Sequence, residues 1–562
     1  MSTSGQEAGT ENSPLLRRHV GHQPDSIYQA TSSLLEDGGT DTLGPRASFG
    51  AHFDAIPVEK RRLGVMSAVM LIFNRVIGTG IFASPSFILR SSGSVGLTFV
   101  MWILGSLVAA AGTAVYIELG TGLPRSGAEK TYLEFIFRRP KYLVTCIFAI
   151  YVPITGISAA AGLVFGEYAI AALDLAPTAF NVRAAAFICL TSCLILHGAL
   201  LDLGLRIQNA LGIFKFVVIF LVAGSGILSL LKFPGFAVGP EFDPPLSFSS
   251  WDSFWEGSDV GPTAFVTGMF NVIWSYIGYS NANYALSETR DPVRTIKRAA
   301  PLAMFFVACS YIFINIAYFA VVSKQDILGS GTVAAALFFR NLYGPATARA
   351  SFSHTILSAI IALSTLGNIL SVFFTQGRLV QELGREGVVP FSSLFASNKP
   401  FGAPLAGTSV QYLSTIIVVL AAPPGDAYLF IVNLASYPMV MFNMVLTGGL
   451  LLLYTAPFKA WDWNPPFKAY KPVVVFFFLA NIFLAVIPLL PPNRGFEVYE
   501  HLPYWSHIVI SIAIGLLGIL YWFVFFKWIP QRRGYRLEQE TVLQDDGVSR
   551  TVLRKVQDDA AH

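Results

Sequence analysis

The sequence predicts an all-α integral membrane protein with twelve transmembrane helices. Of its 562 residues, 54% are hydrophobic and 13% are charged, and the mean hydropathy is +0.57. A soluble globular chain carries about 25% charged residues, so this composition indicates a membrane protein. Apolar runs of roughly 17 to 25 residues are long enough to cross the hydrocarbon core. Only helices or a closed barrel satisfy every backbone amide there, and runs of this length predict helices.

Twelve apolar runs follow one another within a predicted twelve-helix membrane domain, residues 59–530. They lie near residues 63–89, 95–122, 142–172, 182–201, 206–231, 263–288, 299–323, 353–383, 407–424, 427–456, 471–490 and 504–528. The two flanking tails, residues 1–58 and 531–562, have little apolar surface to bury. We therefore expect both tails to be disordered.

Lysine and arginine gather in alternate loops. If the N-terminus is cytoplasmic, the inner loops include residues 123–141 and 289–298, which are rich in both. The longest early outer loop, residues 241–259, is acidic. The positive-inside rule then places both termini in the cytoplasm, and an even number of helices agrees. We expect the plasma membrane, although "ENSPLL", Glu11 to Leu16, fits an acidic dileucine sorting pattern and leaves a vacuolar or endosomal membrane open.

The first apolar run contains residues that should interrupt its helix near the middle. Gly78 and Gly80 lie within "NRVIGTGI", where glycine weakens a helix and leaves the backbone approachable. A helix opened here presents unpaired N–H groups on one side of the break and unpaired carbonyls on the other. The first attract a carboxylate and the second an ammonium. The alternative is a glycine-mediated helix contact or a simple kink.

A second interruption in the sixth run favours the binding site over the kink. Polar residues and Gly278 occupy 275–283 at membrane depth. The first and sixth runs hold corresponding places in two five-helix units, and an odd number of helices forces the second unit to insert upside down. Paired interruptions of this kind indicate a midplane binding site in a transporter.

Several long motifs agree in order with a known family. They include "GTGIF", "ELGTGLPRSGAEKTYLEFIF", "WSYIGYSNANYALSETRDPVRTIKRA" and "GNILSVFFTQGRLVQELGREGVVPFSSLFAS". Over about residues 60–530 the chain resembles the amino acid-polyamine-organocation (APC) superfamily and, more narrowly, the fungal high-affinity methionine permeases. The resemblance implies an APC/LeuT-like fold with discontinuous helices 1 and 6 and alternating access. Its inverted repeats would span about 60–231 and 263–456, with extra helices over 470–528.

The resemblance also implies which residues hold the substrate. The backbone at Thr79, Gly80 and Ile81 would hold its carboxylate, and carbonyls near the ends of both broken helices would hold its amino group. Trp274 matches an aromatic gate, with an ordinary core or lipid-facing tryptophan as the alternative. The full predicted substrate set is Val76, Ile77, Gly78, Thr79, Gly80, Ile81, Trp274, Ser275, Tyr276 and Gly278.

Charged residues at membrane depth need partners or water. In the resembled family a lysine at the place of Lys215 stands in for a sodium ion, tying the fifth run to the first and to the eighth near Ser371 and Thr375. Lys215 is thus a candidate for proton coupling, or alternatively a permanent structural charge. Arg75 would close the cytoplasmic path by pairing with a carboxylate, or only anchor the inner half-helix.

Three acidic residues are candidates for carrying a proton. They are Glu118, Glu167 and Glu288, and a carboxyl group in a low dielectric can hold a proton near neutral pH. Glu118 and Glu288 lie near membrane boundaries, where an ordinary solvated or loop-pairing role is the alternative.

We therefore expect secondary active uptake of a neutral amino acid, L-methionine foremost, by proton symport. The alternatives are a vacuolar or endosomal exchanger of the same fold and a non-transporting amino acid receptor. An enzyme is disfavoured, because the sequence has no P-loop, no metal-ligand cluster and no recognisable nucleophile and base. We expect no cofactor, no metal and no nucleic acid.

The expected partners are the amino acid, protons and the lipid bilayer. All four cysteines fall inside apolar runs, so none is placed in an outer loop to hold a partner chain. A chain that works without an obligate partner is therefore expected. Its tails are where sorting or ubiquitin adaptors would bind.

Overall fold

The computed structural model describes most of the chain. It covers residues 61, 63–78, 80–155, 158–258, 261–330, 334–343, 348–421, 427–455, 463–491, 499, 502–543 and 549–557. Thr79, the Glu11–Leu16 pattern and the 1–58 tail lie outside the described residues.

Nine helical stretches among the described residues are long and apolar enough to cross a membrane. They are α6 (Val95–Gly122), α8 with α9 (Leu143–Thr155, Ala159–Ala172), α10 (Ala179–Gly198), α11 (Leu201–Leu230), α14 (Pro292–Val321), α17 (Ala348–Arg385), α20 (Ala427–Leu453), α21 with η4 (Lys471–Val486, Ile487–Leu489) and α22 with η5 and α23 (Ser506–Phe523, Val524–Trp528, Ile529–Arg533). The other three predicted runs hold shorter apolar helices, α3 (Val65–Val76), α13 (Pro262–Ser275) and α19 (Leu405–Ala421). The prediction of a helical multi-pass membrane protein is confirmed, whereas the count of twelve crossings stays a prediction.

Short helices connect these elements. They are α4 (Gly80–Ala83), α5 (Pro85–Ser92), α7 (Glu129–Ile136), α12 (Trp251–Trp255), the 3₁₀ helix η2 (Asn281–Glu288), α15 (Lys324–Gly329), α16 (Ala334–Tyr343) and α18 (Ser392–Ala396). Local signals set several helix ends. Gly93, with φ of 73°, ends α5 in the left-handed region that glycine tolerates, and the Ser94 hydroxyl then caps α6 by accepting from the Leu97 N–H at 3.1 Å.

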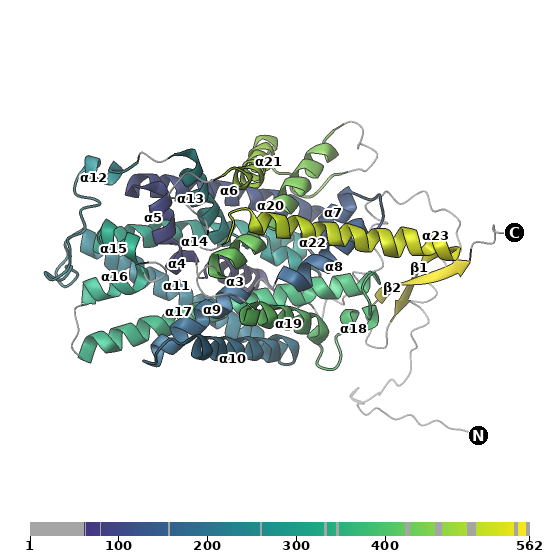
Figure 1. The fold of residues 1–562 in the computed structure, drawn as a ribbon, viewed down its shortest axis with the longest axis horizontal. Coiled ribbons are helices and arrows are strands. Elements are labelled where there is room, and N and C mark those ends of the chain that lie inside the picture. Colours follow the sequence, from purple (N-terminus) through teal and green to yellow (C-terminus); the bar gives the residue numbers. More distant parts are fainter. Residues whose placement is uncertain are drawn as a thin grey trace, which may run out of the picture. The chain divides into compact units, whose positions relative to one another are not determined.

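Helices α14 and α17 hold the centre of the helical bundle. Helix α17 packs against α3, α9, α11 and α19, and α14 packs against α3, α6 and α11. In Figure 1, α3 lies among α11, α14 and α17, each of which packs against it. Helix α3 is thereby enclosed, and even its polar Asn74 is fully buried.

The outer helix faces are apolar. Phe180 on α10, Phe220 and Leu221 on α11 and Leu516 on α22 each expose more than half of their surface. Exposed apolar patches on this scale are a liability in water. They fit faces that lipid covers.

The helical conformation ends at each of the two predicted interruptions. Helix α3 ends at Val76, Ile77 is extended with ψ of 94°, and α4 begins at Gly80. Helix α13 ends at Ser275, and the chain turns through Gly278, with φ of +129°, before η2 begins. The α-helical conformation is therefore interrupted at both places.

The C-terminal tail departs from the expectation of disorder. Strands β1 (Tyr535–Leu543) and β2 (Ser549–Gln557) pair antiparallel, with Glu538 opposite Arg554. Leucine, valine and threonine recur along both strands, and opposite charges face each other across the pair. The expectation of disorder is wrong for these residues, because charge and polarity masked a strand pattern.

Candidate functional site

Tyr311 on α14 ties the two helix breaks together. Its hydroxyl lies 2.6 Å from the carbonyl oxygen of Ser275 and 3.0 Å from that of Val76. A hydroxyl carries one hydrogen, so it donates to one of these carbonyls at a time. The ring of Tyr311 is fully buried and stacks on Trp102 at a centroid distance of 4.6 Å. Nothing in the sequence around Tyr311 predicted this contact, which depends on how α14 packs.

Glycine lets the two broken segments approach each other. A Cβ atom on Gly80 would lie 2.8 Å from Ser275 Oγ and 3.2 Å from Ser275 Cα. A Cβ atom on Gly278 would lie 2.5 Å from Arg75 Cγ. Larger residues would therefore force the segments apart at both positions.

A cavity of about 70 Å³ lies where the two breaks meet, and we call it the central cavity. Its walls come from both breaks, from α8 and α9, and from α17 and α20. Predicted site residues in its lining are Arg75, Val76, Gly78, Gly80, Trp274, Ser275 and Gly278. Asn281, Tyr284, Asn368 and Gln376 add polar groups that the sequence analysis did not assign to the site.

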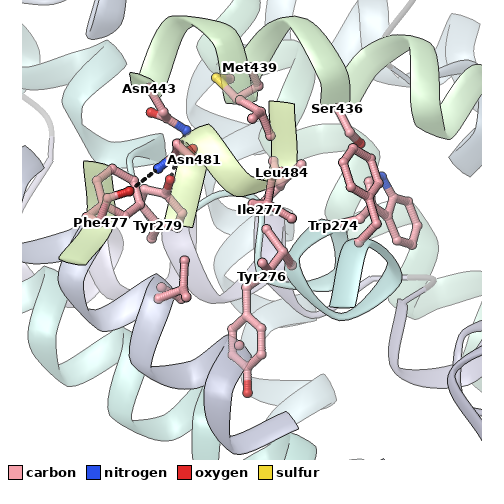
Figure 2. Close-up of a pocket in the computed structure, with 16 residues that line it drawn as sticks. Trp274, Tyr276, Ile277, Tyr279, Ser436, Met439, Asn443, Phe477, Asn481 and Leu484 are labelled. Carbon is pink, nitrogen blue, oxygen red and sulfur yellow. Dashed lines mark hydrogen bonds between the residues drawn. The ribbon is translucent and has the colours of Figure 1, made fainter. Parts of the chain in front are cut away.

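A second cavity of about 20 Å³ adjoins the first, and we call it the aromatic cavity (Figure 2). Trp274, Ile277, Ser436 and Met439 line both cavities and so form the partition between them. The remaining lining is largely aromatic and aliphatic, and includes Phe270, Tyr276, Tyr279, Val440, Phe477 and Leu484.

The other predicted substrate residues lie apart from the central cavity. Tyr276 lines the aromatic cavity, and its hydroxyl lies 2.7 Å from Ser106 Oγ. Ile77 and Ile81 are fully buried and line neither cavity, so the structure does not bring these two predicted residues to the central cavity.

Lys215 on α11 reaches the broken end of α3. Its ammonium donates to the carbonyls of Ile77 at 2.5 Å and Asn74 at 3.1 Å. The last carbonyls of a helix have no partner within the helix and carry partial negative charge. Asn368 donates to a third carbonyl of the same turn, that of Arg75, at 2.5 Å. These two side chains hold the end of α3 open in a defined shape.

Helix α17 meets Lys215 at Gly367, where a Cβ atom would lie 3.2 Å from Lys215 Cε. Ser371, one turn further on, donates to the Leu71 carbonyl at 2.8 Å and accepts from Asn281 at 3.1 Å. Thr375 donates to the Ser371 carbonyl at 3.0 Å. The hydrogen bonds of the described residues do not join Lys215 to either hydroxyl, so Ser371 holds α3 to η2 instead.

Arg75 lines the central cavity and is partly exposed to it. The ion pairs of the described residues do not include Arg75. The carboxylate partner considered for a gate is therefore not seen in the part of the chain that the structure covers. The cavity instead carries a guanidinium on its wall.

The three acidic candidates occupy very different surroundings. Glu118 is fully buried and accepts from Tyr454 Oη, Trp463 Nε1 and the Ala469 N–H at 2.6–2.9 Å. These three hydrogen bonds tie α6 to α20 and to the segment before α21. Glu167 is exposed on α9 and lines neither cavity.

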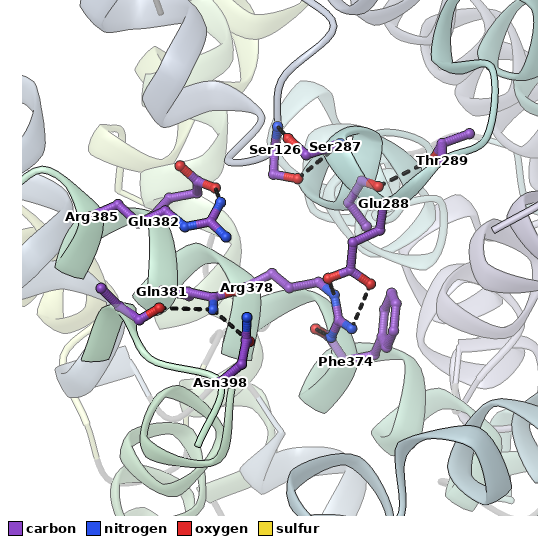
Figure 3. Close-up of polar contacts among 12 residues, drawn as sticks. Ser126, Ser287, Glu288, Thr289, Phe374, Arg378, Gln381, Glu382, Arg385 and Asn398 are labelled. Atoms are coloured by element: carbon purple, nitrogen blue, oxygen red, sulfur yellow. Dashed lines mark hydrogen bonds and ion pairs between the residues drawn. The ribbon is translucent and has the colours of Figure 1, made fainter. Parts of the chain in front are cut away.

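Glu288 at the end of η2 forms a two-pronged ion pair with Arg378 on α17 (Figure 3). The two N···O distances are 2.6 and 2.8 Å, and the arginine side chain is 2% exposed. The backbone of Glu288 also accepts from the Leu63 N–H at 3.1 Å. The alternative considered for Glu288 was a solvated or loop-pairing role, and the structure shows an ion pair that is largely buried.

A second ionic cluster joins α7 to the end of α17. Lys130 pairs with Glu134 at 2.9 Å and with Glu386. Burial lowers the pKa of the Lys130 ammonium, and the nearby Glu134 charge opposes that shift.

Glu129, the first residue of α7, is a buried acid that the sequence analysis did not single out. Its side chain is fully buried, and Oε1 accepts from Tyr116 at 2.7 Å and from Ser280 at 3.0 Å. Ser280 in turn lines the central cavity. Glu129 lies between two apolar runs, where acids are ordinarily solvated, so only packing reveals its burial.

The chain is similar in sequence to known proteins over most of its length. Residues 63–517 match the family model described as amino acid permease. The chain is 39% identical to the high-affinity methionine permease of Saccharomyces cerevisiae, covering 94% of this chain and 90% of that protein. It is 29% identical to the low-affinity methionine permease of the same yeast, covering 89% and 88%. It is 27% identical to the human large neutral amino acids transporter small subunit 2, covering 87% and 84%. The chain therefore belongs to the amino acid permease family.

Proposed function

We propose that this protein takes up L-methionine, and other neutral amino acids less well, by proton symport with alternating access. The observation that carries the proposal is the meeting of two interrupted helices at one cavity, clamped by Tyr311. The similarity to methionine permeases supports the choice of cargo.

The open backbone suits a zwitterion. Main-chain N–H groups around Gly78–Ile81 would bind the carboxylate, and the carbonyls of Val76 and Ser275 would bind the ammonium. These two carbonyls share the single hydrogen of the Tyr311 hydroxyl, and a carbonyl oxygen can accept two hydrogen bonds, so both retain acceptor capacity for an ammonium.

The aromatic cavity would receive the side chain. A thioether is apolar and flexible and packs well against aromatic rings. Trp274 lies on the partition between the cavities and would close over the bound side chain. The described lining of the central cavity includes Arg75 but no carboxylate, which disfavours a cationic cargo.

We also propose how the helices repeat, how the chain is oriented in the membrane and which residue replaces a sodium ion. The breaks after Val76 and Ser275 would be those of helices 1 and 6 in a five-plus-five inverted repeat with twelve crossings. Both termini would lie in the cytoplasm and the protein in the plasma membrane. Lys215 would replace a sodium ion at the end of α3. The four cysteines all lie within helices α8, α10 and α14, which supports a chain that works without a covalently attached partner.

Purified protein in proteoliposomes tests the proposal. We expect radiolabelled methionine to accumulate under an inward proton gradient, to be released by a protonophore and to be indifferent to replacement of sodium by choline. A competition panel of the twenty amino acids should place methionine first. Sodium-dependent accumulation would contradict the role of Lys215, and uptake only into vesicles preloaded with amino acid would show an exchanger.

A further inference from the structure

Glu129 differs from the other buried acids near the site. Glu118 has three donors, and Glu288 and Glu382 have arginine partners. Glu129 is 0% exposed, the ion pairs of the described residues do not include it, and its Oε2 has no hydrogen-bond partner among them. An ionised carboxylate held this way would pay a large desolvation penalty, whereas a neutral acid would not.

The hydrogen atoms around Glu129 can be counted. The Tyr116 hydroxyl lies 2.7 Å from Glu129 Oε1 and 2.7 Å from Asn443 Oδ1, and it has one hydrogen to give. The Asn443 amide nitrogen faces the Tyr279 hydroxyl at 3.1 Å, so its oxygen faces Tyr116. If Glu129 were ionised, one of the two short contacts would lack a hydrogen. If Glu129 is protonated, it donates to Tyr116, which donates to Asn443, and both contacts are satisfied.

The same network can also accommodate the ionised state. A half-turn of the Asn443 amide points its nitrogen at the Tyr116 oxygen, which frees the Tyr116 hydrogen for Glu129. Tyr279 then donates to the amide oxygen. Asn443 and Tyr279 both line the aromatic cavity, so the proton on Glu129 and the contents of that cavity are linked through two side chains.

The Ser280 hydroxyl connects Glu129 to the central cavity. Ser280 Oγ lies 3.0 Å from Oε1 and lines that cavity, and Tyr284, which also lines it, lies beside the carboxylate. Both residues follow the break after α13, so a rearrangement of that segment would open or close the connection.

We propose that Glu129 carries the proton that drives uptake and exchanges it with the central cavity through the Ser280 hydroxyl. The role rests on the proposed symport. In the loading step, Ser280 gives its hydrogen to a Glu129 carboxylate oxygen and takes one from the cavity side, so the serine is unchanged and the acid is neutral. Unloading reverses the step once the cavity opens to the other side.

The surroundings favour the neutral acid. Burial raises the pKa of Glu129, and the nearby hydroxyls of Tyr284, Tyr116 and Ser280 oppose the shift only in part. The titratable groups that face it are tyrosines, namely Tyr116 from α6, Tyr132 from α7, Tyr151 from α8, and Tyr279 and Tyr284 from the segment after α13. Arg75 is the nearby cation, close to Tyr284 and Tyr151 across the central cavity.

Glu129→Gln tests the proposal because glutamine resembles the protonated acid. In proteoliposomes, we expect this variant to exchange internal for external methionine at a rate within about twofold of wild type, but to lose accumulation under a proton gradient. Glu129→Asp keeps a titratable group, so it should restore accumulation with a shifted pH profile. Glu134→Gln, on the same short helix, is the matched control and should accumulate methionine like wild type.

Infrared difference spectroscopy of the wild type provides a readout that does not depend on how the variants fold. Methionine binding should perturb the carbonyl stretch of a protonated carboxylic acid, and this band should be missing in Glu129→Gln. Gradient-driven accumulation by Glu129→Gln, or a wild type without such a band, would overturn the role of Glu129 while leaving symport intact. A wild type that only exchanges methionine would overturn both.

Discussion

Gly80 packs directly against Ser275, the last residue of α13, and contributes main chain rather than a side chain to the lining of the central cavity. Lys215 and Asn368 hold the neighbouring carbonyls of α3 from the other side. Because several groups hold one short stretch of backbone, even a single added methyl group should displace that backbone and alter the central cavity.

We expect Gly80→Val to reduce methionine affinity roughly a hundredfold, equivalent to about 2.7 kcal/mol, because its Cβ would meet Ser275 at 2.8 Å. Gly224→Val on α11 is the control, since a Cβ atom there meets nothing within 4 Å. Binding of labelled methionine to the purified variants measures both. Unchanged affinity in Gly80→Val would contradict a carboxylate site on this backbone.

At the scale of elements, the two broken helices are joined by contacts from intact ones. Helix α14 contributes Tyr311 to the ends of α3 and α13, and α17 contributes Arg378 to the end of η2. Tyrosine can clamp two helix ends because its hydroxyl reaches both carbonyls while its ring stays packed.

Tyr311→Phe should weaken methionine binding and lower stability by about 1–3 kcal/mol, since the two carbonyls that share the Tyr311 hydrogen lose it. Tyr318→Phe, on the same helix, is the matched control. Tyr318 is also buried, but its hydroxyl has no hydrogen-bond partner among the described residues, so its loss should be neutral or stabilising. Thermal unfolding with and without methionine separates the two, and equal effects would argue against the clamp.

Arg378→Gln should destabilise the protein by about 2–4 kcal/mol, because it leaves Glu288 without its partner in a largely buried position. The Arg378→Gln, Glu288→Gln double variant should lose much less than the sum of the single variants, as a double-mutant cycle of melting temperatures would show. Arg554→Gln, which breaks an exposed pair in the hairpin, should change nothing measurable. Additive effects of the first two substitutions would mean that the pair is not energetically coupled.

For the whole molecule, apolar outer faces and uneven loop charges specify how the chain sits in a bilayer. Epitope tags at the two ends should both become accessible to antibodies only after cells are permeabilised, because lysine and arginine are retained on the cytoplasmic side. A tag within residues 241–259 should be accessible on intact cells. Accessibility of one terminus from outside would contradict an even number of crossings.

Much of this architecture could be predicted from the sequence because it depends on local pattern. Long apolar runs specify helices in lipid, and Gly78, Gly80 and Gly278 mark where those helices cannot continue. The C-terminal hairpin was missed because its strands are rich in charged and polar residues, so their composition resembled that of a disordered tail.

What only the tertiary structure decided are contacts between distant parts of the chain. Tyr311 and Glu129 resemble many other tyrosines and glutamates in the sequence, and it is packing that places one across both helix breaks and buries the other beside the central cavity. The physical reason is that backbone hydrogen bonding in lipid is a local demand that each segment must satisfy itself. Which polar side chains are left facing a shared cavity depends on how the helices pack.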